Sequence, residues 1–261
     1  MIEQIKNFFK KNTKEPDITF WSVIDEIENI SPFTKSIDNI PDWFKKLDHT
    51  ILDKTVKGCM PFLDSLSAGY LLRMPQDLNL RHNVDNKNEK EEFKDSFQTY
   101  GLHDCSQILW AKSVNLNSGI DSHTIEQLKG SPLIEKNKNL PFYKILNPWK
   151  IKTPKGYSCL FVPPLNNSDD RFSIIPAIVD TDVFPNEINF PIVINGDKYP
   201  ILETTIKKGT PYVQVIPFKR ESWKMIFKPR KQKEIQNSRL FYTLKLLNIY
   251  KDKYWNKKLW K

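Results

Sequence analysis

Short runs of β-branched and aromatic residues, separated by prolines, fill the centre of the chain between about residues 66 and 218. The runs read YSCLFV, IIPAIVD, FPIVI, ILETTI and YVQVI, and 11 of the 18 prolines fall between Pro141 and Pro217. Short strands divided by turn residues at nearly regular intervals are typical of all-β sandwiches and barrels. Both alternating sets of YSCLFV are largely apolar, so we expect this strand to be central, with both faces covered.

Helical patterns flank this region. The stretches MIEQIKNFFKKN and FWSVIDEIENI each place apolar residues on one helical face. Asp42 follows Pro41 directly, which predicts the start of a helix. The polar stretch RHNVDNKNEKEEFK, residues 81–94, predicts a solvent-exposed excursion such as a hairpin tip. The sequence therefore predicts a mainly β protein: a helical N-terminal extension at 1–60, a β-domain at 61–218 and a basic helical tail at 219–261.

The positive charge is concentrated in the tail. Residues 219–261 carry 14 Lys and Arg against 3 Asp and Glu, a net charge of +11, whereas residues 1–218 carry 26 against 28, a net charge of −2. Leucines at helical spacing predict an amphipathic helix from about Lys231 onward. One interpretation is that the tail binds nucleic acid phosphates or an acidic partner. The other, which we favour, is that the tail packs its apolar stripe on the body or on a neighbouring subunit. Its basic cluster is Lys228, Arg230, Lys231 and Lys233.

Composition narrows the class of protein. A chain of 261 residues with 39% apolar content can bury one core. Three irregularly spaced cysteines form neither a metal pattern nor an even disulfide framework, which favours a reducing compartment. The first residues lack the apolar core of a signal peptide, and no window approaches a membrane span, so we expect a soluble protein. No P-loop, dinucleotide or zinc-protease motif occurs, and we predict neither a metal nor a cofactor.

The order of three stretches resembles the dUTPase and dCTP-deaminase superfamily. They are IKTPKGYSCLFVPPLN, AIVDTDVF and IKKGTPYVQV, and SAGYLL is similar to the opening strand of that superfamily. The resemblance implies a β-barrel core and a homotrimer. It places Gly156 after the strand-opening proline, Asp180 in the aspartate-containing turn, and Gly209 and Gln214 in the last strand motif.

The catalytic set of that superfamily is largely missing. Leu165 and Asn166 occupy the region of the phosphate-binding arginine and serine, Val183 replaces the tyrosine, and Leu71 replaces the acid. Without a fixed positive charge, this loop has no group that pairs with the negative charge of a triphosphate. An arginine from elsewhere beside Asp180 would contradict this picture of a vacant phosphate site.

The remaining matched positions form a candidate ligand pocket. Its members are Asp180, Phe184, Gly209 and Gln214. The alternative is structural: Gln214 satisfies loop backbone, since an unpaired buried amide costs about 1 to 3 kcal/mol, and Asp180 is a local hydrogen-bond acceptor.

A second resemblance spans most of the chain. The stretches IPDWFKKLDHTILDKTVKGCMPFLDSLSAGYLL, LNPWKIKTPKGYSCLF and IKKGTPYVQVIPFKRESW are similar to a protein family of marine tailed phages that carries no assigned activity. This implies a viral protein located in the virion or the host cytoplasm. Two functions follow: a non-catalytic, oligomeric virion or interaction component, with a trimer favoured, or a divergent nucleotide-binding enzyme or sensor.

Overall fold

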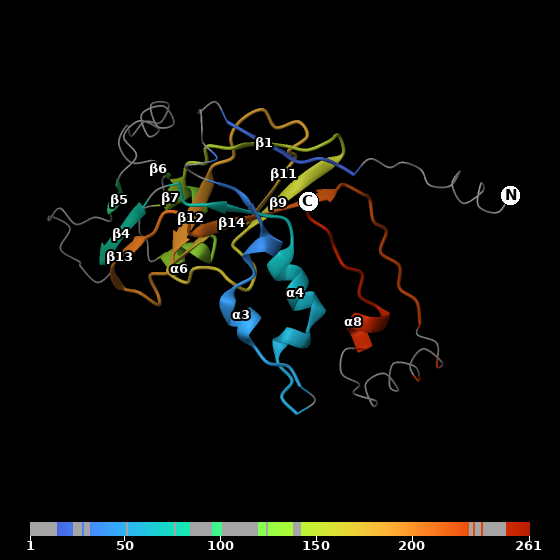
Figure 1. Cartoon of the computed structure of the whole chain (residues 1–261). Helices are drawn as coiled ribbons and strands as arrows, with labels where there is room; N and C mark the ends of the chain where they lie inside the picture. The colour runs from blue at the N-terminus through green and yellow to red at the C-terminus, as the bar shows by residue number, and fades with distance from the viewer. Residues whose placement is uncertain are drawn as a thin grey trace.

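The computed structural model describes residues 15–22, 28, 32–50, 52–75, 77–83, 96–100, 120–123, 125–137, 142–229, 232, 236 and 249–261. Strands dominate these residues, and the helices are short (Figure 1). The protein is therefore mainly β, as predicted. The first predicted helix, MIEQIKNFFKKN, lies outside the described residues.

The largest sheet has five antiparallel strands in the order β11-β9-β14-β3-β2. The strands are β11 (Ala177–Val179), β9 (Tyr157–Val162), β14 (Pro211–Lys219), β3 (Tyr70–Arg73) and β2 (Thr34–Lys35). Strand β9 is the predicted YSCLFV run, and it lies between β11 and β14. Cys159 and Phe161 on β9 are fully buried, which confirms the prediction of a central strand.

Three smaller antiparallel sheets complete the fold. One has the order β10-β12-β7-β6, one β13-β4-β5 and one β1-β8. Their strands are β10 (Phe172–Ile174), β12 (Phe190–Ile194), β7 (Phe142–Ile145), β6 (Ile120–His123), β13 (Ile201–Ile206), β4 (Asp77–Asn83), β5 (Ser96–Tyr100), β1 (Thr19–Trp21) and β8 (Lys150–Lys152). The runs FPIVI and ILETTI are β12 and β13, as predicted. IIPAIVD is divided between β10 and β11 because Pro176 has no N–H to donate to a ladder.

None of the four sheets closes on itself among the described residues, because each strand order has two free ends. The predicted dUTPase-like barrel therefore stays a prediction. The predicted excursion at 81–94 falls between β4 and β5, which pair antiparallel with Arg81 opposite Ser96. The flanking hairpin is thus present, while residues 84–95 lie outside the described part of the chain.

One hydrophobic core joins the two largest sheets. The Phe161 ring on β9 lies 5.4 Å from the Phe190 ring on β12, and Phe190 lies 5.7 Å from Tyr212 on β14. Buried aliphatic side chains surround these rings, among them Leu72, Leu80, Ile174, Ile192, Ile194, Ile206, Val213 and Val215. Each such side chain contributes about 1.5 to 3 kcal/mol when it leaves water. This core fixes β9 and β14, which carry the residues of the candidate site.

The N-terminal segment contributes strands as well as helices. The helix predicted over FWSVIDEIENI is wrong at Phe20 and Trp21, because both residues belong to β1, which pairs with β8. The alternation of the strand turns Phe20 inward, where its ring stacks on Phe33 at 4.2 Å. The helix predicted after Pro41 is confirmed as α3 (Asp42–Lys46). A second helix, α4 (Met60–Ser67), leads into β3.

The tail leaves the sheets after β14 and returns to them near the C-terminal end (Figure 1). Residues 220–229 form neither helix nor strand, and α8 covers Ile249–Lys253. Beyond α8, the indole N–H of Trp255 donates to the Asp64 carboxylate at 3.0 Å, and Lys258 Nζ lies 2.6 Å from the same group. This end of the tail therefore contacts the body, whereas the leucines whose packing was the favoured alternative lie outside the described residues. Most of the helix predicted from Lys231 lies outside the described residues.

Candidate functional site

The β8–β9 turn is the centre of a polar cluster. Gly156 adopts a φ of 88°, a left-handed conformation that favours glycine. The turn closes where the Tyr157 N–H donates to the Pro154 carbonyl at 3.1 Å. The N–H of Gly156 then points at Asp182 and donates to its carboxylate at 2.8 Å. The glycine singled out by the superfamily resemblance thus shapes this turn.

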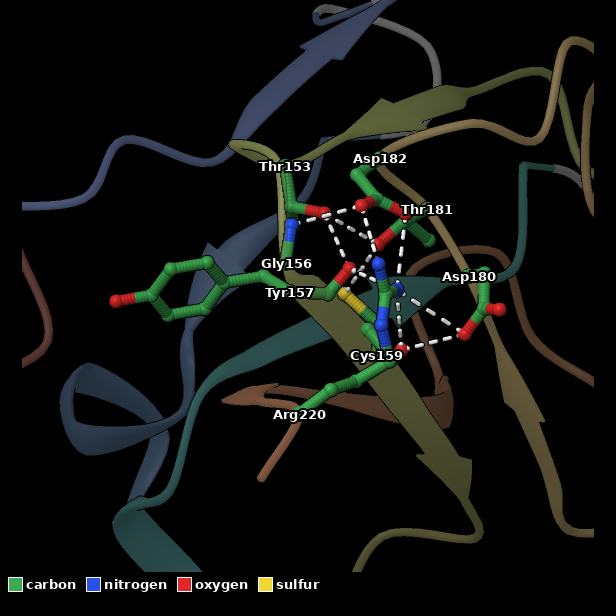
Figure 2. Close-up of polar contacts among 9 residues, drawn as sticks. Thr153, Gly156, Tyr157, Cys159, Asp180, Thr181, Asp182 and Arg220 are labelled. Atoms are coloured by element: carbon green, nitrogen blue, oxygen red, sulfur yellow. Dashed lines mark hydrogen bonds and ion pairs between the residues drawn. The ribbon is translucent and has the colours of Figure 1, made fainter. Parts of the chain in front are cut away.

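Arg220 connects this turn to the turn after β11 (Figure 2). Its guanidinium makes a charge-assisted, two-pronged contact with the Asp182 carboxylate, and one of its N–H groups lies 3.1 Å from Asp180 Oδ1. It also donates to the Tyr157 carbonyl and the Ser158 hydroxyl, each at 2.9 Å. Planar, two-pronged pairing of this kind fixes both partners in one orientation.

The two aspartates differ in environment. The Asp182 side chain is 2% exposed, whereas the Asp180 side chain is 57% exposed. The Arg220 guanidinium and then the Gly156 N–H lower the pKa of Asp182 to about 2. In return, hydrogen bonding to Asp182 raises the pKa of Arg220. The cluster is therefore a charged clasp that holds the start of the tail on the sheet.

This clasp corrects the prediction that the place beside Asp180 is vacant. Arg220 fills it, and its positive charge is already shared by two carboxylates. The sequence contained a signal that was missed: Arg220 follows β14 directly, and strand pairing brings its N–H to the Gly156 carbonyl at 2.8 Å. Aligning β14 with β9 in register would have placed Arg220 next to the turn.

Buried hydroxyl groups lie beside the clasp. The hydroxyl groups of Thr153 and Thr181 form a hydrogen bond of 2.7 Å, and the Thr181 hydroxyl donates to Cys159 Sγ at 3.4 Å. Burial raises the pKa of the Cys159 thiol to about 11. The thiol is therefore protonated at neutral pH and is a packing group, not a nucleophile.

Gln214 is a buried amide whose hydrogen bonds are all made to backbone. Its carbonyl oxygen accepts from the Leu165 N–H at 2.8 Å, and its NH₂ group donates to the carbonyls of Ser65 at 2.9 Å and Ala68 at 2.6 Å. Its exposed fraction is 1%. The amide thus joins β14 to the end of α4 and to the loop after β9, which is the structural role given as the alternative.

The structure does not bring the four candidate pocket residues around one cavity. Asp180 accepts from the Ser158 hydroxyl at 2.6 Å, whereas Gln214 lies opposite Val162, four residues further along β9. At about 3.3 Å per residue, that separation is about 13 Å. Gly209 lies beyond the other end of β14, in the turn after β13. Phe184 packs against the hydrophobic core one turn after Asp180.

The loop that would hold phosphate is fastened to the body. The Leu165 N–H is bound to Gln214, and the Asn166 side chain donates to the Ser65 hydroxyl at 2.7 Å. Asn166 has a φ of 57°, a conformation that asparagine tolerates. Arg171, just after the loop, pairs with Asp169 at 2.6 Å. The Leu165 N–H and the Arg171 guanidinium, which a phosphate would need, are therefore already bound to other groups of the protein.

Large apolar side chains project from the start of the tail. Trp223, Met225 and Phe227 are 89%, 79% and 86% exposed, and Ile226 is 62% exposed. Lys228, in the predicted basic cluster, is also exposed. Arg230, Lys231 and Lys233 lie outside the described residues. Nothing in the composition of the tail distinguished this apolar segment from the stretch predicted to be helical.

A cavity of about 340 Å³ lies between the two ends of the described chain and the large sheet. Its lining includes the aromatic residues Tyr70, Tyr157 and Trp260 and the charged residues Glu15, Asp17 and Lys261. None of the four candidate pocket residues lines it. The Tyr157 ring points away from the Arg220 cluster (Figure 2), while Thr153, which also lines the cavity, is hydrogen-bonded to Thr181 beside the clasp.

The structure is a mainly β protein with a charged clasp and with exposed apolar side chains at the start of its tail. Across the described ranges, no group of three or more His, Cys, Asp or Glu residues could hold a metal ion. A search of the same residues finds no helix long and apolar enough to span a bilayer. Comparison with family models, curated proteins and solved structures finds no match.

Proposed function

We propose that this protein is a non-catalytic interaction component of a tailed phage that assembles into a homo-oligomer, with a trimer favoured. The virion and the infected host cytoplasm are its proposed locations, and the dUTPase-like barrel is its proposed core architecture. The observation that supports assembly is the exposure of Trp223, Met225 and Phe227. Contiguous exposed apolar side chains of this size mark interaction sites.

The spacing of these residues fits strand addition. Trp223, Met225 and Phe227 occupy alternate positions, so an extended backbone presents them on one face, with Lys224, Ile226 and Lys228 on the other. An extended segment of this kind binds by pairing with an open sheet edge and inserting alternate side chains into apolar contacts. We name residues 222–228 the apolar arm.

A second copy of the chain is the proposed acceptor. Strand β11 is an edge of the large sheet, and its Ile178 side chain is 63% exposed. Val183, shortly after β11, is 68% exposed. The body of the chain has a net charge of −2, and the arm carries Lys224 and Lys228, so charge repulsion does not oppose the approach of an arm from one copy to the body of another.

The alternative, a divergent nucleotide-binding enzyme or sensor, is disfavoured by the contacts of the matched positions. At the loop where phosphate would bind, the Leu165 amide is hydrogen-bonded to Gln214 and Arg171 is paired with Asp169. Arg220 is neutralised by Asp180 and Asp182. A thermal-shift screen against nucleotides tests this alternative directly, because a ligand that binds only the folded state raises the melting temperature.

Analytical ultracentrifugation tests the assembly. We expect the wild type to sediment as an oligomer and the Trp223→Ser/Met225→Ser/Phe227→Ser variant as a monomer. The matched control replaces three other exposed apolar residues, Leu52, Val56 and Ile201, by serine, and should remain oligomeric. A monomeric wild type, or a control that dissociates as completely as the arm variant, would overturn the proposal.

A further inference from the structure

We infer that the charged clasp controls the assembly: it directs the apolar arm toward another copy of the chain and away from the edge strand of its own copy. This positioning role of Arg220, Asp180 and Asp182 rests on the proposed function. Only Glu221 separates Arg220 from the arm. The place from which the arm starts therefore depends on where Arg220 is held.

Arg220 is fastened through both its backbone and its side chain. Its N–H donates to the Gly156 carbonyl at 2.8 Å. Its guanidinium binds the Asp182 carboxylate and lies 3.1 Å from Asp180 Oδ1 (Figure 2). Because these partners belong to two different turns, the side chain opposes the separation of the end of β14 from β9.

The chain beyond Arg220 has little other support near the arm. Residues 221–229 are exposed and form neither helix nor strand. Glu221 pairs with Lys219 at 3.1 Å, but both side chains are largely exposed, and surface ion pairs of this kind contribute little stability. Within the described tail segment that starts at Lys219, the clasp is therefore the main attachment at the root of the arm.

The same clasp ties the root of the arm to the acceptor edge of its own copy. Asp180 directly follows Val179, the last residue of β11. Strand β9 lies between β11 and β14 and is antiparallel to both, so β11 and β14 end on the same side of the sheet. Neighbouring strands lie about 4.8 Å apart. A strand added outside β11, three strand positions from β14, would therefore lie about 14 Å from β14.

The start of the arm cannot span that distance while Arg220 is clasped. Trp223 is three residues beyond Arg220, a segment that reaches about 11 Å at most. Trp223 therefore falls short of the free edge of β11 in its own copy, whereas the edge of another copy is not subject to this limit. Breaking the clasp frees the last residues of β14 and lengthens the segment that can fold back. It also removes the preorganisation of the arm for its partner.

Sedimentation of the full chain over a range of concentrations tests the positioning role. We expect Arg220→Gln to raise the Kd of self-association by about ten-fold or more. Asp180→Asn, at a half-exposed position, should raise it by about three-fold. The matched control is Gln214→Leu, which removes hydrogen bonds near the other end of β14. It should leave the Kd unchanged although it also lowers stability. Circular dichroism confirms that each variant is folded, and Asp180→Asn decides if Arg220→Gln is not.

Cross-linking distinguishes the two directions of the arm. Copies with ordinary and heavy nitrogen are mixed in equal amounts and treated with a lysine-reactive reagent. We expect the cross-links of Lys224 to join mixed isotopes in the wild type and to shift toward a single isotope in Arg220→Gln. An oligomeric wild type whose Kd is unchanged by both clasp variants, or raised as much by Gln214→Leu, would overturn the positioning role alone. An unchanged isotope pattern would also overturn it, whereas a monomeric wild type would overturn the proposed assembly as well.

Discussion

The side-chain carbonyl of Gln214 accepts a hydrogen bond from the backbone N–H of Leu165 at 2.8 Å, across 49 residues of sequence. The same amide donates to the carbonyls of Ser65 and Ala68. One side chain therefore satisfies backbone groups in the loop after β9 and at the end of α4. A residue that the superfamily resemblance placed near a nucleotide acts here as a structural crosslink.

Replacing Gln214 by leucine should lower the free energy of unfolding by about 2 to 4 kcal/mol, because the buried groups that it satisfies lose their partners. Urea unfolding followed by circular dichroism measures the change. The matched control is Gln127→Leu at an exposed position, where we expect a change within about 0.5 kcal/mol. Equal stability of the two variants would contradict the structural role of Gln214.

Acid should weaken the clasp between Asp182 and Arg220. The folded pKa of Asp182, about 2, lies below its ordinary value of 3.8. A depressed folded pKa stabilises the folded state at pH values above the ordinary pKa, and this contribution is lost as the pH falls toward 2. We therefore expect Asp182→Asn to be less stable than the wild type at pH 6, with the difference shrinking between pH 5 and 2.

Chemical unfolding of both proteins across this pH range provides the measurement. Asp77 and Asp170 also have lowered pKa values, through Lys207 and Lys198, but they are common to both proteins and cancel in the difference. Arg220→Gln should show the same pH dependence as Asp182→Asn. A stability difference that stays constant from pH 6 to pH 2 would rule out the clasp as its source.

The two described cysteines should differ in reactivity. Cys59 is exposed, whereas Cys159 is buried and its thiol has a pKa raised to about 11 by burial. Because the thiolate is the reactive form, brief alkylation at pH 8 should modify Cys59 and spare Cys159 in the folded protein. Peptide mass spectrometry measures both sites. Modification of Cys159 only after unfolding in urea is the expected result, and equal labelling in the folded state would refute its burial.

Gly69 allows two strands to approach closely. A Cβ at this position would lie 1.9 Å from the Val215 carbonyl oxygen, and φ is +63°. Gly69→Ala should therefore destabilise the protein by about 3 kcal/mol or more. Gly130 is the matched control, since it has a φ of +84° and open space around it, so Gly130→Ala should cost only about 1 to 2 kcal/mol of backbone strain. Thermal melts compare the two, and a larger loss for Gly130→Ala would contradict the close approach.

The strands could be predicted because their signal is local. YSCLFV, FPIVI and ILETTI are β-branched or aromatic runs with turn residues on both sides, and each is a strand with the predicted bounds. Phe20 and Trp21 were misassigned because an apolar spacing that suits one helix turn also suits a three-residue strand, and pairing with β8 decides between them. That pairing joins residues about 130 positions apart and leaves no local pattern.

The site was less predictable for the same reason. Arg220 meets Asp182 only through the register of β14 on β9. The cavity is formed by segments from both ends of the chain, whose proximity no sequence pattern records. Gly156 and Asp180 lie in turns and Gln214 lies in a strand, but whether each binds a ligand or backbone depends on partners distant in sequence.

The central claim is that the apolar arm binds another copy of the chain, and cross-linking of a mixed sample tests it most directly. Wild-type protein grown with the ordinary nitrogen isotope is mixed with protein grown with the heavy isotope, treated with a lysine-reactive reagent, and analysed by mass spectrometry. The account predicts cross-links of mixed isotope content between Lys224 or Lys228 and the body of the chain, and their loss in Trp223→Ser/Met225→Ser/Phe227→Ser. Cross-links from these lysines that join only peptides of the same isotope would contradict it.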